Sequence, residues 1–189
     1  MDYIYFNWSK IYFQCLELAK KIKKDKFIPD LILGLARGGL IVARLLSDFL
    51  GVKEIGTLQL EYYKTLEQKK SIPKLINEIS CNINEKTILL CDDLVDTGES
   101  MVYILNYIRK KGSRIIKVAT LHTKSHSKFT PDYFIKEVDA WIIYPWELKE
   151  TILALQKSIK NIDKLQKKLS ELKIENVIIK ELLDFMNNN

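Results

Sequence analysis

The stretch "ILLCDDLVDTGES", residues 88–100, decides the fold of this chain. Its first four residues are apolar or nearly so, as in a strand that is buried on both faces of a parallel sheet. Asp92 and Asp93 follow side by side, and Asp96 comes three residues later. Because neighbouring carboxylates repel one another, we expect a cation or a group rich in hydroxyls to lie against them.

A second apolar run, "LILGLA" at 31–36, precedes a glycine-rich turn at 37–39 and a helical pattern that ends at Gly51. The remaining patterns predict helices at 7–26 and 99–112, strands at 54–60, 114–121 and within 140–146, and long loops at 62–73 and 122–132. This alternation predicts an α/β fold with a mostly parallel sheet flanked by helices. Such sheets bind ligands beyond the carboxyl ends of their strands, where 37–39 and 92–100 both fall.

The residues after Trp146 contain no Gly or Pro. Apolar residues recur there by threes and fours over 152–172, which predicts one amphipathic helix followed by a second short one. We expect these helices to pack on their own domain or on a twin subunit. The sequence is therefore divided into an α/β domain at 1–149 and a C-terminal helical extension at 150–189.

Composition excludes several classes of protein. Of the 189 residues, 47% are hydrophobic and 29% charged, as in a soluble globular domain. The net charge of +6 fits a phosphate partner or a solvated surface, and with Lys interleaved among acids we expect no nucleic-acid partner. We expect no membrane span and no signal peptide. The scattered cysteines Cys15, Cys81 and Cys91 indicate reduced thiols and a cytoplasmic location.

The two odd loops suit a phosphorylated sugar. Gly98 permits a tight turn, and the residues around it present N–H groups and hydroxyls at a helix N-terminus, which suits a phosphate. Asp92 and Asp93 would accept hydrogen bonds from neighbouring hydroxyls, so the pair of features describes a ribose 5-phosphate. Arg37 beside two glycines suits a second phosphate or a pyrophosphate. Carboxylates close to phosphates also indicate Mg²⁺.

Simpler interpretations exist for each loop. Asp96 alone would be a helix first-turn charge, and Gly38 with Gly39 an ordinary turn. The tripeptide "DTG" also occurs in aspartic proteases, but those proteins are all-β and a helix follows here. Because both loops follow buried strands, their joint occurrence favours a ligand site.

The same stretches resemble a known family. "ILLCDDLVDTGES" resembles the phosphoribosyl pyrophosphate (PRPP) signature of type I phosphoribosyltransferases, and "LILGLARGGLIVARLLSDFLG" resembles their pyrophosphate loop and helix. "LHTKSHSKFTPDYF" and "DAWIIYPWE" resemble the 6-oxopurine branch. Over roughly 8–149, the resemblance implies transfer of ribose 5-phosphate from PRPP to hypoxanthine, guanine or xanthine, giving a nucleoside monophosphate and pyrophosphate in purine salvage.

The resemblance also implies roles for individual residues. Asp92 and Asp93 would hold the ribose hydroxyls, directly or through Mg²⁺, and Asp96 would be catalytic by handling the proton of purine N7. The 5′-phosphate would lie against Thr97, Gly98, Glu99 and Ser100. The pyrophosphate would lie against Ala36, Arg37 and Gly38, with a cis peptide before Arg37. Lys124 would donate to the purine 6-oxygen, Trp141 would stack on the base, and Ile142 would face its 2-position. The loop at 62–73 would be a lid.

Some positions depart from the family pattern. No Arg follows Arg114, so Lys149 is an open candidate for a pyrophosphate contact, and Glu147 stands where Asp is expected. His122 and His126 have the spacing of a metal pair, but we favour ordinary loop histidines. We expect a homodimer or higher homo-oligomer. Two other functions stay open: a PRPP-binding regulatory protein of the same fold, and a phosphoribosyltransferase for another base such as adenine.

Overall fold

The computed structural model describes residues 2–64 and 71–187. The chain forms two compact units. The larger unit is Tyr12–Asp139, and the smaller combines Met1–Ile11 with Ala140–Asn189. Within the described residues, no helix is both long and apolar enough to cross a bilayer.

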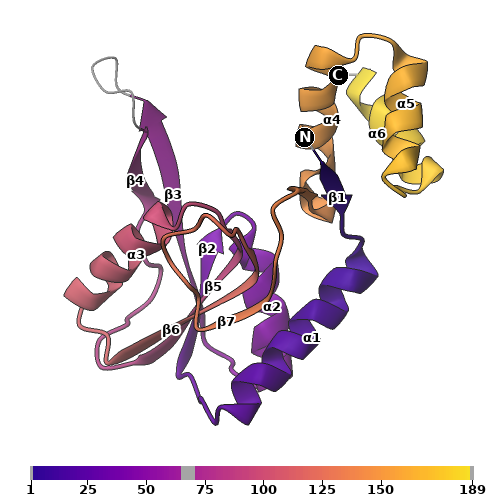
Figure 1. Cartoon of the computed structure of the whole chain (residues 1–189). Coiled ribbons are helices and arrows are strands. Elements are labelled where there is room, and N and C mark those ends of the chain that lie inside the picture. The colour runs from indigo at the N-terminus through magenta and orange to yellow at the C-terminus, as the bar shows by residue number, and fades with distance from the viewer. Residues whose placement is uncertain (1, 65–70, 188–189) are drawn as a thin grey trace. The chain divides into compact units, whose positions relative to one another are not determined.

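The larger unit is built on one six-stranded sheet (Figure 1). In spatial order its strands are β4 (Ser71–Asn77), β3 (Ile55–Lys64), β2 (Leu31–Ala36), β5 (Thr87–Val95), β6 (Ile115–Thr123) and β7 (Tyr133–Glu137). Every neighbouring pair is parallel except β3 and β4, which are antiparallel. The prediction of an α/β fold with a mostly parallel sheet is confirmed.

Three helices flank this sheet: α1 (Trp8–Lys24), α2 (Gly39–Leu50) and α3 (Glu99–Lys110). Gly51 ends α2 in the left-handed conformation, with φ of 73°, as the sequence predicts. One core forms where Ile104 and Ile108 of α3 meet Leu33 of β2 and Leu90 of β5. The helices thus follow their strands closely, and the β2–α2 and β5–α3 turns lie at the carboxyl edge of the sheet.

The smaller unit contains a two-stranded parallel sheet of β1 (Tyr3–Tyr5) and β8 (Trp141–Ile143). A 3₁₀ turn, η1 (Pro145–Glu147), leads into α4 (Leu148–Ser158), α5 (Ile162–Glu171) and α6 (Asn176–Asn187). Tyr5 and Ile143 of the strands share a buried cluster with Ile152, Leu165 and Leu183 of the helices. The C-terminal helices therefore have a core of their own together with the first strand of the chain.

The prediction of a long loop at 62–73 is wrong at both ends. Strand β3 continues to Lys64 and β4 begins at Ser71, with Tyr62 opposite Pro73 and Lys64 opposite Ser71. Antiparallel pairing supplies backbone hydrogen bonds to a polar sequence that carries little apolar periodicity, so the pattern does not indicate these strands. Residues 65–70 lie outside the described residues, and so does that part of the predicted lid.

The prediction of two C-terminal helices is also wrong, because the described residues after Trp146 form three: α4, α5 and α6. Ile159 has an extended backbone (φ −116°, ψ 90°) and ends α4. The side chain of Asn161 then caps α5 by accepting a hydrogen bond from the Lys164 N–H at 2.9 Å. The apolar spacing continues across this break because all three helices bury residues in one cluster. The predicted last strand, β8, lies in the small sheet rather than in the larger one, and β7 and β1 were not predicted.

Candidate active site

The turn between β2 and α2 lies directly against the acidic end of β5. A Cβ atom on Gly38 would lie 1.8 Å from Oδ2 of Asp93, and one on Gly39 would lie 2.4 Å from the carbonyl oxygen of Cys91. Only glycine therefore permits this close approach. The peptide between Ala36 and Arg37 is cis, as expected, and Arg37 is exposed. The two loops that the sequence singled out thus meet in space.

Asp92 and Asp93 belong to β5 itself, which continues to Val95 instead of ending at Cys91. Asp92 is paired with Thr120 of β6, and both carboxylates are half-buried. The backbone N–H of Asp93 donates to Oδ1 of Asp92 at 3.0 Å. Strand geometry therefore orients the two side chains from a fixed backbone at the carboxyl edge of the sheet.

The turn from β5 into α3 has the geometry expected of a phosphate loop. Gly98 occupies the helix N-cap in the left-handed conformation, with φ of 84°. The N–H of Glu99 donates to Oγ1 of Thr97 at 3.4 Å. Asp96, Thr97 and Glu99 are exposed and Ser100 is half-buried. Because the N-terminal N–H groups of a helix carry partial positive charge, this turn favours an anion.

The loop after β6 is hydrogen-bonded to that turn at several positions. The N–H of Lys124 donates to the carbonyl of Val95 at 3.0 Å, and the N–H of Lys128 donates to the carbonyl of Thr97 at 3.1 Å. Between these bonds, Nε2 of His126 lies 2.8 Å from Oδ1 of Asp96. Sequence reasoning missed this contact, because the histidine spacing was considered only for metal binding. The resemblance assigns both Lys124 and Asp96 to the purine base. That shared assignment was the signal that could have placed the loop of Lys124 and His126 beside Asp96.

Lys124 is half-buried at the start of this loop. Ser125 fixes the loop further by donating its N–H and its hydroxyl to Oδ1 of Asp139, at 3.0 and 2.8 Å. These hydrogen bonds, together with the charges of Lys124 and His126, lower the pKa of the Asp139 carboxyl. Asp139 therefore stays ionised beside the loop that begins at Lys124, and it adds a negative charge close to that lysine.

His122 is not a loop residue, as the sequence suggested, but a fully buried residue of β6. Burial, followed by the charges of Lys136 and Lys124, lowers its pKa to about 3. The imidazole is therefore neutral at physiological pH, and its Nε2 lies 3.1 Å from the Nε2 amide nitrogen of Gln14. Among the described residues no group of three or more His, Cys, Asp or Glu side chains could hold a metal ion by itself.

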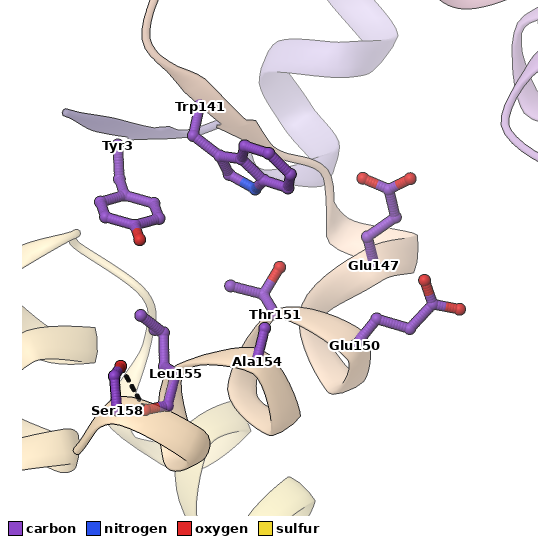
Figure 2. Close-up of a pocket in the computed structure, with 8 residues that line it drawn as sticks. All are labelled: Tyr3, Trp141, Glu147, Glu150, Thr151, Ala154, Leu155 and Ser158. Carbon is purple, nitrogen blue, oxygen red and sulfur yellow. Dashed lines mark hydrogen bonds between the residues drawn. The ribbon is translucent and has the colours of Figure 1, made fainter. Parts of the chain in front are cut away.

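The remaining predicted site residues belong to the smaller unit. Trp141 is 54% exposed, and Ile142 is buried with its backbone paired to Ile4 of β1. Figure 2 shows the Trp141 and Tyr3 rings on one side of a cavity of about 400 Å³, opposite α4. The cavity is lined by Tyr3, Trp141, Glu147, Glu150, Thr151, Ala154, Leu155 and Ser158. An aromatic wall of this kind can hold a flat ring.

The two open candidates for a pyrophosphate or metal contact also lie in this unit. Glu147 lines the cavity beside α4 (Figure 2). The ammonium of Lys149 lies 5.1 Å from the centre of the Phe185 ring, a cation–π contact that joins α4 to α6. Lys149 thus has a structural partner within the helical part of the chain.

Comparison with known proteins agrees with this geometry. The phosphoribosyl transferase domain family matches residues 4–151. A xanthine-guanine phosphoribosyltransferase of Cereibacter sphaeroides is 29% identical over 151 residues, covering 75% of this chain and 85% of that protein. The crystal structure of a purine phosphoribosyltransferase from Pyrococcus horikoshii Ot3 superposes with a TM-score of 0.70 at 32% identity, covering 77% and 94% of the two chains. A Helicobacter pylori xanthine-guanine-hypoxanthine phosphoribosyltransferase superposes with a TM-score of 0.68 at 25% identity, covering 80% and 98%.

Proposed function

The chain belongs to the phosphoribosyl transferase domain family, and we propose that it is a purine phosphoribosyltransferase of the 6-oxopurine type. It transfers ribose 5-phosphate from PRPP to hypoxanthine, guanine or xanthine, and it releases pyrophosphate. One observation carries this proposal: the Gly38–Gly39 turn lies directly against the acidic end of β5, where a Cβ on Gly38 would overlap Asp93. A pyrophosphate site and a ribose site then share one edge of the sheet.

PRPP would bind across that edge. Asp92 and Asp93 would accept hydrogen bonds from the ribose 2′ and 3′ hydroxyls, since ionised carboxylates are acceptors only. The 5′-phosphate would occupy the turn of Thr97, Gly98, Glu99 and Ser100 at the start of α3, where backbone N–H groups favour an anion. The pyrophosphate would lie on Ala36, Arg37 and Gly38. The guanidinium of Arg37 suits its charge.

The reaction breaks the bond between C1′ and the pyrophosphate oxygen and forms a bond between C1′ and the base nitrogen. Positive charge develops on the sugar as the leaving group departs, and the fixed carboxylates of Asp92 and Asp93 stabilise that charge. Asp96 would accept the proton that purine N7 loses as the other ring nitrogen bonds to C1′. The electron pair of the broken bond leaves with pyrophosphate.

Mg²⁺ fits this donor set. Two neighbouring, half-buried carboxylates at the predicted ribose site offer the oxygen ligands that Mg²⁺ prefers, and Mg²⁺ characteristically takes further ligands from substrate phosphates and water. Asp92 and Asp93 would hold it directly or through the ribose hydroxyls. When bound, the ion supplies charge neutralisation to the leaving pyrophosphate. A site that needs substrate oxygens agrees with the lack of a complete protein metal cluster in the described residues.

Three residues would recognise the base. Lys124 carries only donors, which suit the 6-oxygen of an oxopurine and would oppose the amino group of adenine. Trp141 would stack on the base and Ile142 would face its 2-position through its backbone. The exposed ring of Trp141 supports this role. Glu147 and Lys149 stay open as contacts to the metal or pyrophosphate.

Three broader proposals accompany the reaction. We propose residues 1–149 as the phosphoribosyltransferase domain and 150–189 as a helical extension; the family match, which ends at residue 151, supports this division. The free cysteines Cys15, Cys81 and Cys91 support a cytoplasmic location. We also propose a homodimer or higher homo-oligomer, which light scattering after size-exclusion chromatography would test.

The deciding experiment is an assay of the product. The protein is incubated with PRPP and Mg²⁺ and with hypoxanthine, guanine, xanthine or adenine separately, and nucleotides are resolved by chromatography. We expect a monophosphate from at least one oxopurine, little or none from adenine, and none after Asp93→Asn. Measurable PRPP binding without any nucleotide product would overturn the proposal in favour of a PRPP-binding regulatory protein. Product from adenine alone would overturn it in favour of a phosphoribosyltransferase for adenine.

A further inference from the structure

The contact between His126 and Asp96 joins two loops that lie 30 residues apart in sequence. Nε2 of His126 is 2.8 Å from Oδ1 of Asp96. An ionised carboxylate can only accept a hydrogen bond, so Nε2 must carry the proton and donate it. The carboxylate has a second oxygen, Oδ2, with lone pairs of its own. One oxygen of Asp96 is therefore engaged by the imidazole while the other can meet a proton from elsewhere.

The backbone on both sides of this pair is fixed. The bond from Lys124 N–H to the Val95 carbonyl precedes it, and the bond from Lys128 N–H to the Thr97 carbonyl follows it. Gly98 continues the contact, because a Cβ there would lie 2.6 Å from Cβ of Phe129. The two loops thus run side by side in register, with the imidazole and carboxylate in the middle. Little freedom remains to be lost when the two side chains meet.

Stability alone does not explain the pair. The His126 and Asp96 side chains are 60% and 62% exposed, and exposed ion pairs contribute little to folding. The backbone bonds would hold the loops together without it. What the imidazole does control is the direction of the Asp96 carboxylate at the carboxyl edge of the sheet.

We propose that His126 is a positioning residue that orients Asp96 for the proton transfer from the acceptor base. This inference rests on the proposed function, in which Asp96 takes that proton. Oδ1 is held by His126, which leaves Oδ2 to take the proton, and the carboxylate does not have to find its orientation in each catalytic cycle. Asp139 is a further charged group close to the imidazole, because the charges of Lys124 and His126 both contribute to lowering the pKa of the Asp139 carboxyl.

The test compares three single variants with the wild-type protein. His126→Ala is expected to lower kcat about tenfold with an unchanged KM for PRPP, because a misoriented group near the reacting atoms costs turnover rather than binding. His126→Gln is expected to restore most of the rate, since its amide nitrogen reaches the position of Nε2 and donates. Thr130→Ala, an exposed change in the same loop, is the matched control and should leave both parameters unchanged.

A double variant shows whether His126 acts through Asp96. Asp96→Asn combined with His126→Ala should be no slower than Asp96→Asn alone, because residues that act as a unit are not additive. Additive losses, an equally low rate in the Gln variant, or a His126→Ala enzyme with wild-type kcat would each overturn the inference while wild-type turnover upholds the function. A wild-type protein without turnover on any base would instead overturn the proposed function, and this inference with it.

Discussion

The ionisable side chains at the two ends of strand β6 have different surroundings. Near its start, Lys117 forms an ion pair with Asp25 and a hydrogen bond of 2.9 Å with the Tyr133 hydroxyl, and its ammonium lies 5.1 Å from the centre of the Phe27 ring. Near its end, His122 is buried and neutral, and Lys124 and His126 follow on a loop that contacts the acidic turn.

The two ends differ in what satisfies their charges. At the start, hydrogen bonds with Asp25 and Tyr133 raise the pKa of Lys117, and hydrogen bonds from Lys117 and Tyr133 lower the pKa of Asp25. Lys117, Asp25 and Tyr133 thus satisfy one another within the protein, as in a structural contact. At the carboxyl edge of the sheet, the neighbouring strand β5 places Asp92 and Asp93 against the Gly38–Gly39 turn and leads into the N-terminus of α3, an arrangement that suits a phosphorylated ligand. The two edges of the sheet thus separate a structural contact from the proposed site.

The largest effect is expected at the carboxyl edge of the sheet from Gly38→Ala, in the turn between β2 and α2. The new Cβ would displace the carboxylate of Asp93, since the two would lie 1.8 Å apart. We expect kcat/KM for PRPP to fall roughly 100-fold, the scale of a displacement of about 1 Å in an active site. Steady-state kinetics measure this. Gly51→Ala is the matched control: its Cβ meets open space at φ of 73°, so it should cost some stability and no activity.

Acidification should lower the stability of the folded protein through His122, which stays neutral while the unfolded chain takes up a proton. Its pKa is about 3 in the folded protein, against 6.5 for a free histidine side chain, so below pH 6.5 the unfolded chain binds a proton that the folded chain does not. Stability is therefore fully present above pH 6.5 and is lost as pH falls towards 3. We expect a loss of about 2 kcal/mol by pH 5. Asp25 and Asp30, whose pKa values are lowered, contribute only at lower pH.

Urea unfolding at pH 7 and pH 5 measures this loss, and His122→Gln should remove most of it. A Gln variant that loses as much stability as the wild-type protein between these pH values would assign the proton to another group.

Lys124→Gln sharpens the comparison by changing specificity at the functional end. An amide both donates and accepts, so the amino group of adenine would gain a partner that lysine cannot offer. We expect the ratio of adenine to hypoxanthine use to rise about tenfold, the value of one hydrogen bond. Competition between the two bases in a single assay measures the ratio. An unchanged ratio would show that Lys124 does not read the 6-position.

The smallest effect is expected at the structural end. Lys117→Met removes the ammonium between Asp25 and Tyr133 but keeps the length of the side chain. We expect the Tm to fall by roughly 3 °C, as for the loss of a partly exposed charged hydrogen bond in a domain of this size. Differential scanning calorimetry measures the shift, and kcat should not change. Loss of turnover in this variant at full folding would contradict the separation of the two ends.

Sequence reasoning was most successful where local pattern and tertiary contact agree. Buried parallel strands are apolar throughout, so β2 and β5 were found from "LILGLA" and "ILLC". The end of α2 was found from Gly51, which adopts the left-handed conformation in the structure. Sequence reasoning failed for β4, whose sequence has little apolar periodicity, and for β7, which is short and partly exposed. It failed also at Ile159, where a side-chain cap at Asn161 divides an uninterrupted apolar pattern.

The candidate site shows the same division. That Asp92, Asp93 and Asp96 share one edge with Arg37 and Gly38 followed from the sequence, because parallel strands bring their carboxyl ends together. The sequence did not predict which other side chains contact these residues. Nothing in the spacing of His122 and His126 indicates that one is buried in β6 and the other donates to Asp96.

The sequence by itself determined the α/β scaffold and the place of its site, since strand burial, helix periodicity and glycine turns are local properties of the chain. Only the tertiary structure decided which side chains meet across loops, and which histidine is neutral. It also decided that the first strand joins the C-terminal helices. These outcomes depend on register and burial between segments far apart in sequence, and local patterns carry no record of them.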